Sequence, residues 1–111
     1  MNFFVIGVNH KTAPVEVRER FAISEAKLPD ALRQLTEMPG VEEGMIVSTC
    51  NRVEIIARAK NGNCNLQDFV RKYYGFEPDQ FQKYIFEHSQ KAAVHHLFRV
   101  AASLDSMVVG E

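Results

Sequence analysis

The cysteine at position 50 is the residue of this chain best suited to act as a nucleophile. It stands in the segment Ser48-Thr49-Cys50-Asn51-Arg52, between two short runs rich in β-branched residues. The end of a strand can hold a thiol rigidly while leaving it open to a ligand, and the neighbouring guanidinium of Arg52 would favour the thiolate over the thiol. Structural packing is the default alternative, because free cysteine is among the residue types most often buried.

A thiol nucleophile needs an orienting partner, and His96 is the candidate for that role. The segment after Ser89 predicts a helix whose core-facing apolar stripe consists of Val94, Leu97, Phe98, Ala101, Leu104 and Val108. At about 100° per residue, a polar row forms on the opposite side. Its members are His96, Arg99, Ser103 and Ser106. The plain alternative is a solvated helix face, which every amphipathic helix presents.

The other histidines have ordinary explanations. His10 belongs to a loop, His88 to a strand end and His95 to a helix flank. Because the chain contains no Cys-x-x-Cys or His-x-x-x-His pair, we predict no metal site. No G-x-G-x-x-G motif follows Gly7, so the chain is not expected to bind a dinucleotide by itself.

The composition is that of an ordinary soluble domain. The chain has 111 residues, of which 46% are hydrophobic and 24% charged, and this length supports one core. The formal net charge of -1 gives no overall field that would hold a polyanion. The apolar run Phe3-Phe4-Val5-Ile6 is too short for a secretory or membrane-spanning segment, so we expect a cytoplasmic protein with free thiols at Cys50 and Cys64.

The order of predicted elements indicates the fold class. The predicted strands cover residues 2–9, 44–49, 52–59 and 85–88. The predicted helices cover residues 15–21, a segment capped by Ser24 that ends before Pro39, residues 66–74 and the segment after Ser89. This order predicts an α+β, ferredoxin-like (split β-α-β) antiparallel sheet with helices on one face and an extra C-terminal helix. Cys50 and Asn51 would form the tip of a hairpin.

Three blocks of the chain carry a family resemblance. They are residues 7–14, residues 48–54, and residues 96–106 with 109–111. Together they resemble glutamyl-tRNA reductase, in the family's order and spacing, and they match only its N-terminal catalytic domain. Ile56 and Ala102 stand where the family commonly has an aromatic residue and a glycine, and neither touches a proposed role.

The resemblance implies a reaction and a set of site residues. Cys50 would form a thioester with the glutamyl group of glutamyl-tRNA, which NADPH then reduces to glutamate-1-semialdehyde for tetrapyrrole biosynthesis. His96 would orient or polarise the ester carbonyl. The substrate-binding residues implied are Thr49, Asn51, Arg52 and Ser106. A guanidinium suits the γ-carboxylate of the substrate, because its planar fork donates two parallel hydrogen bonds.

The same resemblance implies an organisation and partners. Residues 1–111 would be the catalytic domain, and we expect the family's NADPH-binding and dimerisation domains to be absent from this chain. We therefore expect the chain to be acylated by glutamyl-tRNA but not to complete the reduction. The resemblance also implies a homodimer for the full-length protein, no membrane partner, and glutamate-1-semialdehyde aminomutase, the next enzyme of the pathway, as a further candidate partner.

A non-catalytic RNA-binding module is the alternative function. Such a ferredoxin-like domain would bind RNA on its sheet, with contacts from Phe3, Phe4, Lys11, Arg18 and Arg20. Adjacent aromatic residues of a strand point to opposite faces, and the net charge is close to zero. The predicted sheet is therefore poorly suited to stacking of bases. A structural domain with an inert cysteine is the third possibility.

Overall fold

The fold is built on a four-stranded sheet. The computed structural model describes the backbone of residues 2–110 and the side chains of residues 2–77 and 79–102. The strands are β1 (Phe3–Asn9), β2 (Val41–Ser48), β3 (Arg52–Ala59) and β4 (Phe86–Ser89). Their spatial order is β2-β3-β1-β4, and every neighbouring pair is antiparallel. Because β3 separates β1 from β2, this is the split β-α-β arrangement, and the predicted ferredoxin-like α+β fold is confirmed.

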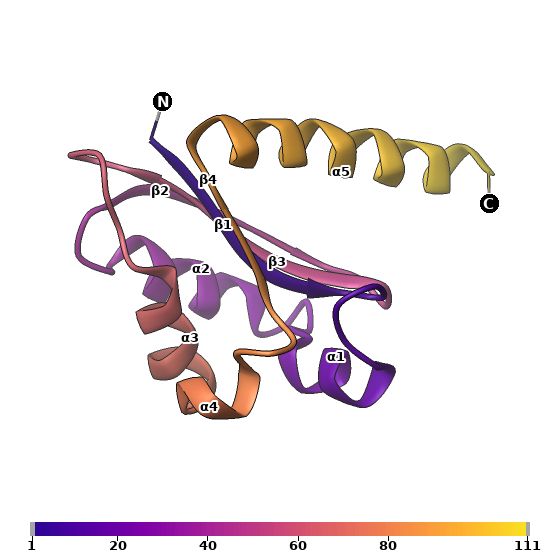
Figure 1. The fold of residues 1–111 in the computed structure, drawn as a ribbon, viewed down its shortest axis with the longest axis horizontal. Coiled ribbons are helices and arrows are strands. Elements are labelled where there is room, and N and C mark those ends of the chain that lie inside the picture. The colour runs from indigo at the N-terminus through magenta and orange to yellow at the C-terminus, as the bar shows by residue number, and fades with distance from the viewer. Residues whose placement is uncertain (1, 111) are drawn as a thin grey trace.

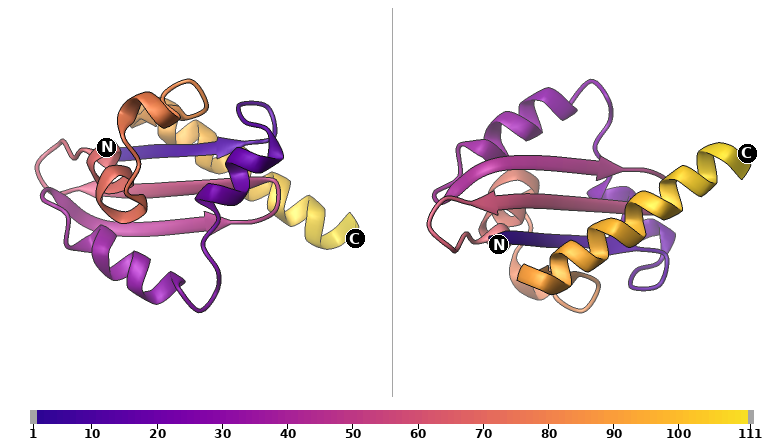
Figure 2. Two further views of the ribbon diagram at one scale, coloured as in Figure 1. Left: turned by 90° about the horizontal axis from the view of Figure 1, so that it is seen from below. Right: turned by 90° about the horizontal axis from the view of Figure 1, so that it is seen from above.

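Helices cover both faces of this sheet. They are α1 (Val15–Phe21), α2 (Leu28–Thr36), α3 (Leu66–Tyr74), α4 (Pro78–Phe81) and α5 (Gln90–Gly110). Figure 1 shows α1–α4 on one side of the sheet and α5 on the other. Helix α5 lies against β1 and β4 and crosses the sheet diagonally (Figure 2). Among the helices that the structure describes, none combines the length and the apolar character needed to cross a bilayer.

Two predicted boundaries differ from the structure. The N-cap predicted at Ser24 is wrong: α2 begins at Leu28, and the backbone carbonyl of Ser24 instead accepts the amides of Lys27 and Leu28, both at 3.0 Å. Pro29 accounts for the later start, since proline is preorganised for the first turn of a helix. Strand β2 begins at Val41, before the residue 44 that was predicted, and its extra residues include an irregularity in register.

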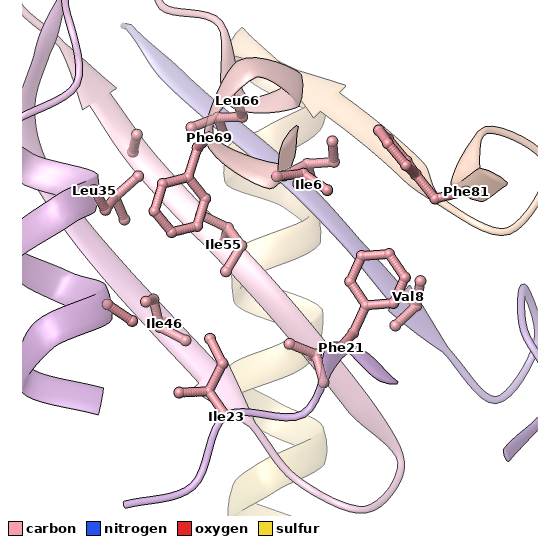
Figure 3. Packing of buried hydrophobic residues seen from close by; sticks show 14 of the residues in the cluster. Ile6, Val8, Phe21, Ile23, Leu35, Ile46, Ile55, Leu66, Phe69 and Phe81 are labelled. Carbon is pink, nitrogen blue, oxygen red and sulfur yellow. The ribbon is translucent and has the colours of Figure 1, made fainter. Parts of the chain in front are cut away.

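The main core lies between the sheet and helices α1–α4. Alternate residues of β3 point into it, and Figure 3 shows Ile55 packed near Phe69 of α3 and Leu35 of α2. Gly44 allows α2 to approach, because a Cβ there would lie 2.5 Å from a methyl carbon of Leu35. This side of the sheet is hydrocarbon throughout its buried part, and it supplies most of the packing that holds the domain together.

The second face is a thinner layer under α5, and the prediction of the buried helix stripe was wrong there. Phe98 is 74% exposed and Ala101 is exposed, whereas Ala93, His96 and Val100 are buried. Ala93 packs against Val5 and Ile56 of the sheet, and the imidazole meets a polar partner on the strand below. Val94 and Leu97 of the stripe are half-buried. The side chains of Leu104 and Val108 lie outside the described residues.

Candidate active site

A fully buried glutamate lies at the centre of the face under α5. The alternation of β3 places Arg52, Glu54 and Ile56 on this face, while Val53 and Ile55 point into the main core. Glu54 is 0% exposed. A buried carboxylate is costly unless it is paired and hydrogen-bonded, so its partners identify what the site is built around.

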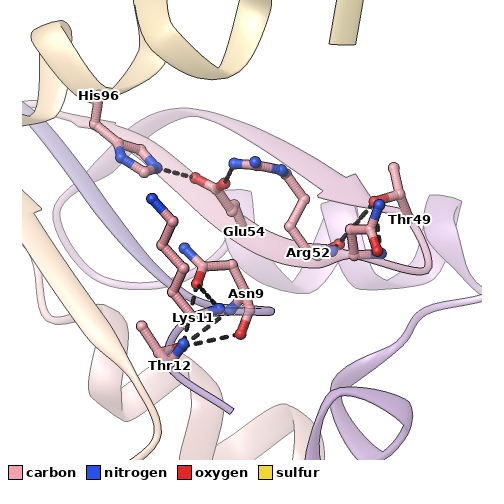
Figure 4. Close-up of polar contacts among 8 residues, drawn as sticks. Asn9, Lys11, Thr12, Thr49, Arg52, Glu54 and His96 are labelled. Carbon is pink, nitrogen blue, oxygen red and sulfur yellow. Dashed lines mark hydrogen bonds and ion pairs between the residues drawn. The ribbon is translucent and has the colours of Figure 1, made fainter. Parts of the chain in front are cut away.

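Each oxygen of the Glu54 carboxylate has a different partner (Figure 4). His96 Nε2 lies 2.5 Å from Oε1, and Arg52 Nη1 donates to Oε2 at 2.8 Å. The three side chains are nearly removed from water, since His96 is 7% exposed and the Arg52 side chain 13%. The Glu54 carboxylate thus connects two of the predicted site residues, Arg52 and His96.

Gly7 makes room for this arrangement. In the register of the sheet, Gly7 of β1 stands opposite both Glu54 on β3 and Phe86 on β4. A Cβ at Gly7 would lie 2.4 Å from the Val53 carbonyl oxygen and 3.1 Å from Glu54 Cγ. His96 contacts both residues that flank the glycine, with its ring centroid 4.9 Å from that of Phe86. The missing side chain therefore leaves space for the buried carboxylate.

An open cleft of about 610 Å³ borders the Arg52 and His96 side chains. Its lining includes the cations Lys11, Arg52 and Arg99, which favour an anionic ligand. The loop that carries Lys11 is fixed by Asn9, whose Oδ1 accepts the amides of Lys11 at 2.9 Å and Thr12 at 3.1 Å. In Figure 4 the Lys11 side chain extends toward the Glu54 and His96 pair.

His88 is a second histidine of the cleft. Its ring centroid lies 4.8 Å from that of His96, and it faces the cleft from β4. Burial lowers the pKa of His88, and the nearby His96 and Arg99 lower that pKa further, while Glu54 opposes them. The neutral form of His88 is favoured as a result.

Cys50 is exposed at the tip of the β2–β3 hairpin. The turn around it is closed by Thr49, whose amide donates to the Arg52 carbonyl at 2.8 Å. The Thr49 hydroxyl accepts the amides of Asn51 at 3.3 Å and Arg52 at 3.2 Å. Cys64, the other cysteine, is half-buried, and burial raises the pKa of its thiol. Both thiols are free, as predicted.

The predicted site residues thus fall into two groups. Thr49, Cys50 and Asn51 form the hairpin tip, and Arg52 and His96 line the cleft. The side chain of Ser106 lies outside the described residues. Among the side chains that the structure describes, no three histidine, cysteine or acidic residues gather closely enough to hold a metal ion.

Sequence reasoning missed Glu54. Two signals were available: the residue lies two positions after Arg52, hence on the same face of the strand, and it interrupts the apolar run 53–57. The structure also shows that the Arg52 guanidinium, expected to favour the Cys50 thiolate, bonds to Glu54.

The alternative function, RNA binding on the sheet, requires an open sheet face. Helices α1–α4 cover one face and α5 crosses the other (Figure 2). Phe3 packs against the small cluster of Val5, Ile56 and Ala93. Phe4 packs against the main core on the other face. Because neither aromatic residue of β1 is free to stack on bases, the cleft is the better candidate for a functional site.

The chain is similar along its whole length to known proteins. The family model for the "Glutamyl-tRNAGlu reductase, N-terminal domain" matches residues 6–111. The chain is 63% identical over 111 residues to "Glutamyl-tRNA reductase 2" of Koribacter versatilis and 50% identical over 114 aligned positions to "Glutamyl-tRNA reductase" of Syntrophotalea carbinolica. In both cases the match covers 100% of this chain and 26% of the relative.

A solved structure shares the fold. "Glutamyl-tRNA Reductase from Methanopyrus kandleri" matches with a TM-score of 0.64 and 28% sequence identity, over 99% of this chain and 24% of that one. The chain therefore spans about a quarter of the length of the proteins it matches. Since the family model and the relatives cover nearly every residue, including the hairpin and the cleft, the chain belongs to the glutamyl-tRNA reductase N-terminal domain family.

Proposed function

We propose that this chain is the part of a glutamyl-tRNA reductase that captures the glutamyl group of glutamyl-tRNA as a thioester on Cys50. The observation that carries the proposal is the exposed thiol on a hairpin tip whose next strand delivers Arg52 into a cation-lined cleft. An exposed thiol on a fixed turn meets the first requirement of a nucleophile, which is access. Family membership supplies the substrate.

The capture step exchanges one ester for another. The sulfur of Cys50 attacks the α-carbonyl carbon, a C–S bond forms, and the C–O bond to the tRNA ribose breaks. The ribose oxygen leaves and takes up a proton, which balances the proton lost by the thiol. Because an aminoacyl ester is already activated, the step depends more on orientation and on stabilisation of the oxyanion than on a strong base.

The cleft is suited to the glutamyl side chain. Arg52 gives one nitrogen, Nη1, to Glu54 and has further donors on the same fork. Lys11 and Arg99 add positive charge to the same lining. A γ-carboxylate placed here would meet charge-assisted donors, whereas the neutral amide of a glutaminyl group would not gain the same attraction. This supports a substrate-binding role for Arg52.

The NADPH used by the family does not fit the described residues. The sheet is antiparallel throughout, whereas a dinucleotide site uses a parallel sheet with a glycine-rich turn after its first strand. The turn after β1 has no glycine and is closed by the Asn9 side chain. We therefore assign reduction of the thioester to glutamate-1-semialdehyde, for tetrapyrrole biosynthesis, to another part of the full-length protein.

Acylation without a reductant tests the proposal. The chain is incubated with glutamyl-tRNA carrying a radiolabelled glutamyl group, quenched in acid, and examined for label on protein. We expect label on the unaltered chain and none on Cys50→Ser. Cys64→Ser is the matched control, and it should be labelled normally because Cys64 is half-buried outside the hairpin tip. Label that survives Cys50→Ser, or its absence from the unaltered chain, would overturn the proposal.

The remaining roles follow from the same family membership. We propose a cytoplasmic location, a homodimer for the full-length protein, and hand-over of its product to glutamate-1-semialdehyde aminomutase. Thr49, Asn51 and Ser106 are proposed as further contacts to the glutamyl group. Alanine substitution of each, with acylation measured at several concentrations of glutamyl-tRNA, would test these contacts.

A further inference from the structure

We propose that Glu54 is a positioning residue, which holds His96 in the tautomer protonated at Nε2 and so leaves Nδ1 as a proton acceptor at the cleft. The tautomer is fixed by the fold alone, while its use in acylation rests on the proposed function. The tautomer decides the role of His96, which by the family resemblance either orients or polarises the ester carbonyl. The two actions require opposite tautomers.

The donors and acceptors around the Glu54 carboxylate determine where the shared proton lies. Arg52 is a donor only, because a guanidinium has no lone pair to offer. It occupies Glu54 Oε2 at 2.8 Å. The other oxygen, Oε1, lies 2.5 Å from His96 Nε2, and a carboxylate in an ion pair with a guanidinium only accepts. The proton between Glu54 and His96 therefore belongs to Nε2.

Apart from Glu54, the charged or titratable side chains around the imidazole are basic. Arg52 and Glu54 compensate each other within the buried group. The other charged or titratable side chains that share the cleft with His96 are His10, Lys11, His88 and Arg99. None of these is an acid, so none of them offers Nδ1 an anionic hydrogen-bond acceptor. A neutral ring with its proton on Nε2 carries a lone pair on Nδ1.

The second ring nitrogen is available. Nδ1 has no hydrogen-bond partner among the side chains and backbone groups that the structure describes, and His96 lines the cleft. An acceptor there cannot polarise a carbonyl oxygen, which needs a donor. It can accept a hydrogen bond from the α-ammonium group of an aminoacyl ester, which is bonded to the carbon next to the reacting carbonyl. His96 would thus orient the ester through its amine.

One substitution should reverse the tautomer. Glu54→Gln keeps the shape of the side chain but leaves a single acceptor oxygen and an NH₂ donor. Arg52 can only donate, so the oxygen must turn to Arg52 and the NH₂ group to His96. His96 Nε2 then has to accept, and the proton moves to Nδ1. Nδ1 would present a donor to the α-ammonium group, and the rate of acylation at saturating glutamyl-tRNA should fall about 10²-fold.

The tautomer is read directly from the ¹⁵N chemical shifts of the His96 ring in the labelled chain. We expect a protonated Nε2 in the unaltered chain and a protonated Nδ1 in Glu54→Gln. Adding Arg52→Met to Glu54→Gln frees the amide to rotate, and the Nε2-protonated form should return. Glu43→Gln is the matched control, because Glu43 pairs with Arg58 on the exposed part of the sheet and should change neither the His96 signal nor acylation.

The outcomes separate the two proposals. A protonated Nδ1 in the unaltered chain, or an unchanged tautomer in a folded Glu54→Gln chain, would overturn the role of Glu54. If Glu54→Gln does not fold, the spectrum of the unaltered chain still decides the tautomer. The expected tautomers without any label on Cys50 would reject the proposed function and leave the positioning of His96 by Glu54 intact.

Discussion

The two faces of strand β3 differ in what their buried residues do. On the side of α1–α4, Val53 and Ile55 enter a core whose buried residues are all hydrophobic. On the side of α5, two positions of the same strand carry Arg52 and Glu54, and they meet an imidazole from the helix above. One strand thus buries hydrocarbon side chains on one face and charged and polar side chains on the other.

The difference shows how a small domain separates stability from function. Loss of volume in a hydrocarbon core lowers the free energy of unfolding, because the cavity stays at least partly unfilled. The contribution of this packing to stability does not depend on pH. The polar face contributes less to folding, since removing two charges and an imidazole from water offsets much of the gain from pairing them. A polar face of this kind is therefore explained better by a positioning role than by stability.

The largest effect on stability should come from the hydrocarbon face. Phe69→Ala removes a side chain that is 1% exposed and leaves a cavity, so the free energy of unfolding should fall by about 3–5 kcal/mol. Urea unfolding followed by circular dichroism measures this. Phe98→Ala makes the same substitution at a residue of α5 that is 74% exposed, and it should stay within about 0.5 kcal/mol of the unaltered chain. Equal effects of the two substitutions would contradict the assignment of the faces.

Removing Glu54 from its buried contacts with Arg52 and His96 should lower the free energy of unfolding less than Phe69→Ala does. The loss should still be far larger than for breaking an exposed ion pair. Glu54→Ala leaves Arg52 without its partner in a site that is 13% exposed, and we expect a loss of about 3 kcal/mol. Glu43→Ala breaks the exposed pair with Arg58 on the same sheet and should cost less than about 1 kcal/mol. The comparison fails if the two glutamates prove equally costly in the same urea titrations.

Two glycines sharpen the contrast between the faces. Gly7→Ala would press a Cβ against the Val53 carbonyl oxygen and Glu54 Cγ, and Gly44→Ala would press one against Leu35. Each should cost about 1–3 kcal/mol of unfolding free energy. Only Gly7→Ala should also shift the ¹⁵N signals of the His96 ring, because only its clash reaches the polar face. A shift of similar size in Gly44→Ala would show that the faces are coupled.

The smallest effect should be a pH dependence that arises from His88. Its pKa is lowered in the folded chain, so the unfolded chain, with a pKa of about 6.5, takes up the proton first. Stability is therefore complete above about pH 6.5 and decreases as the pH falls toward the folded pKa. One proton limits the slope to about 1.4 kcal/mol per pH unit. Urea titrations from pH 7.5 downward should show a shallower decrease for His88→Gln, and an unchanged slope would remove His88 as the cause.

Most of the fold was predictable from the sequence because local signals agreed with the tertiary structure. Strand β3 was predicted as residues 52–59, and helices α1 and α3 as residues 15–21 and 66–74, which the structure confirms. Alternation, turn residues and apolar spacing all pointed to the same elements in these segments. The later start of α2 was missed because the effect of Pro29 on the first turn outweighed a serine upstream.

The site was harder to predict because its centre contradicts the rule that charged residues face water. Cys50, Arg52 and His96 could be selected by type, but the rule placed His96 on a solvated side of α5 and Phe98 in the core. The burial of His96 depends on Glu54, which lies 42 positions away in sequence. No periodicity within one helix encodes a partner on another element, so this part required the packed structure.

The closed turn at Thr49 has an entropic consequence. Its amide and hydroxyl are bonded to Asn51 and Arg52, so the backbone on both sides of Cys50 is held before any ligand arrives. The thiol keeps only the rotation about its own Cα–Cβ bond, and an incoming acyl group need not freeze a loop in order to meet it. The conformational entropy of the turn is lost during folding and is not lost again each time a substrate binds.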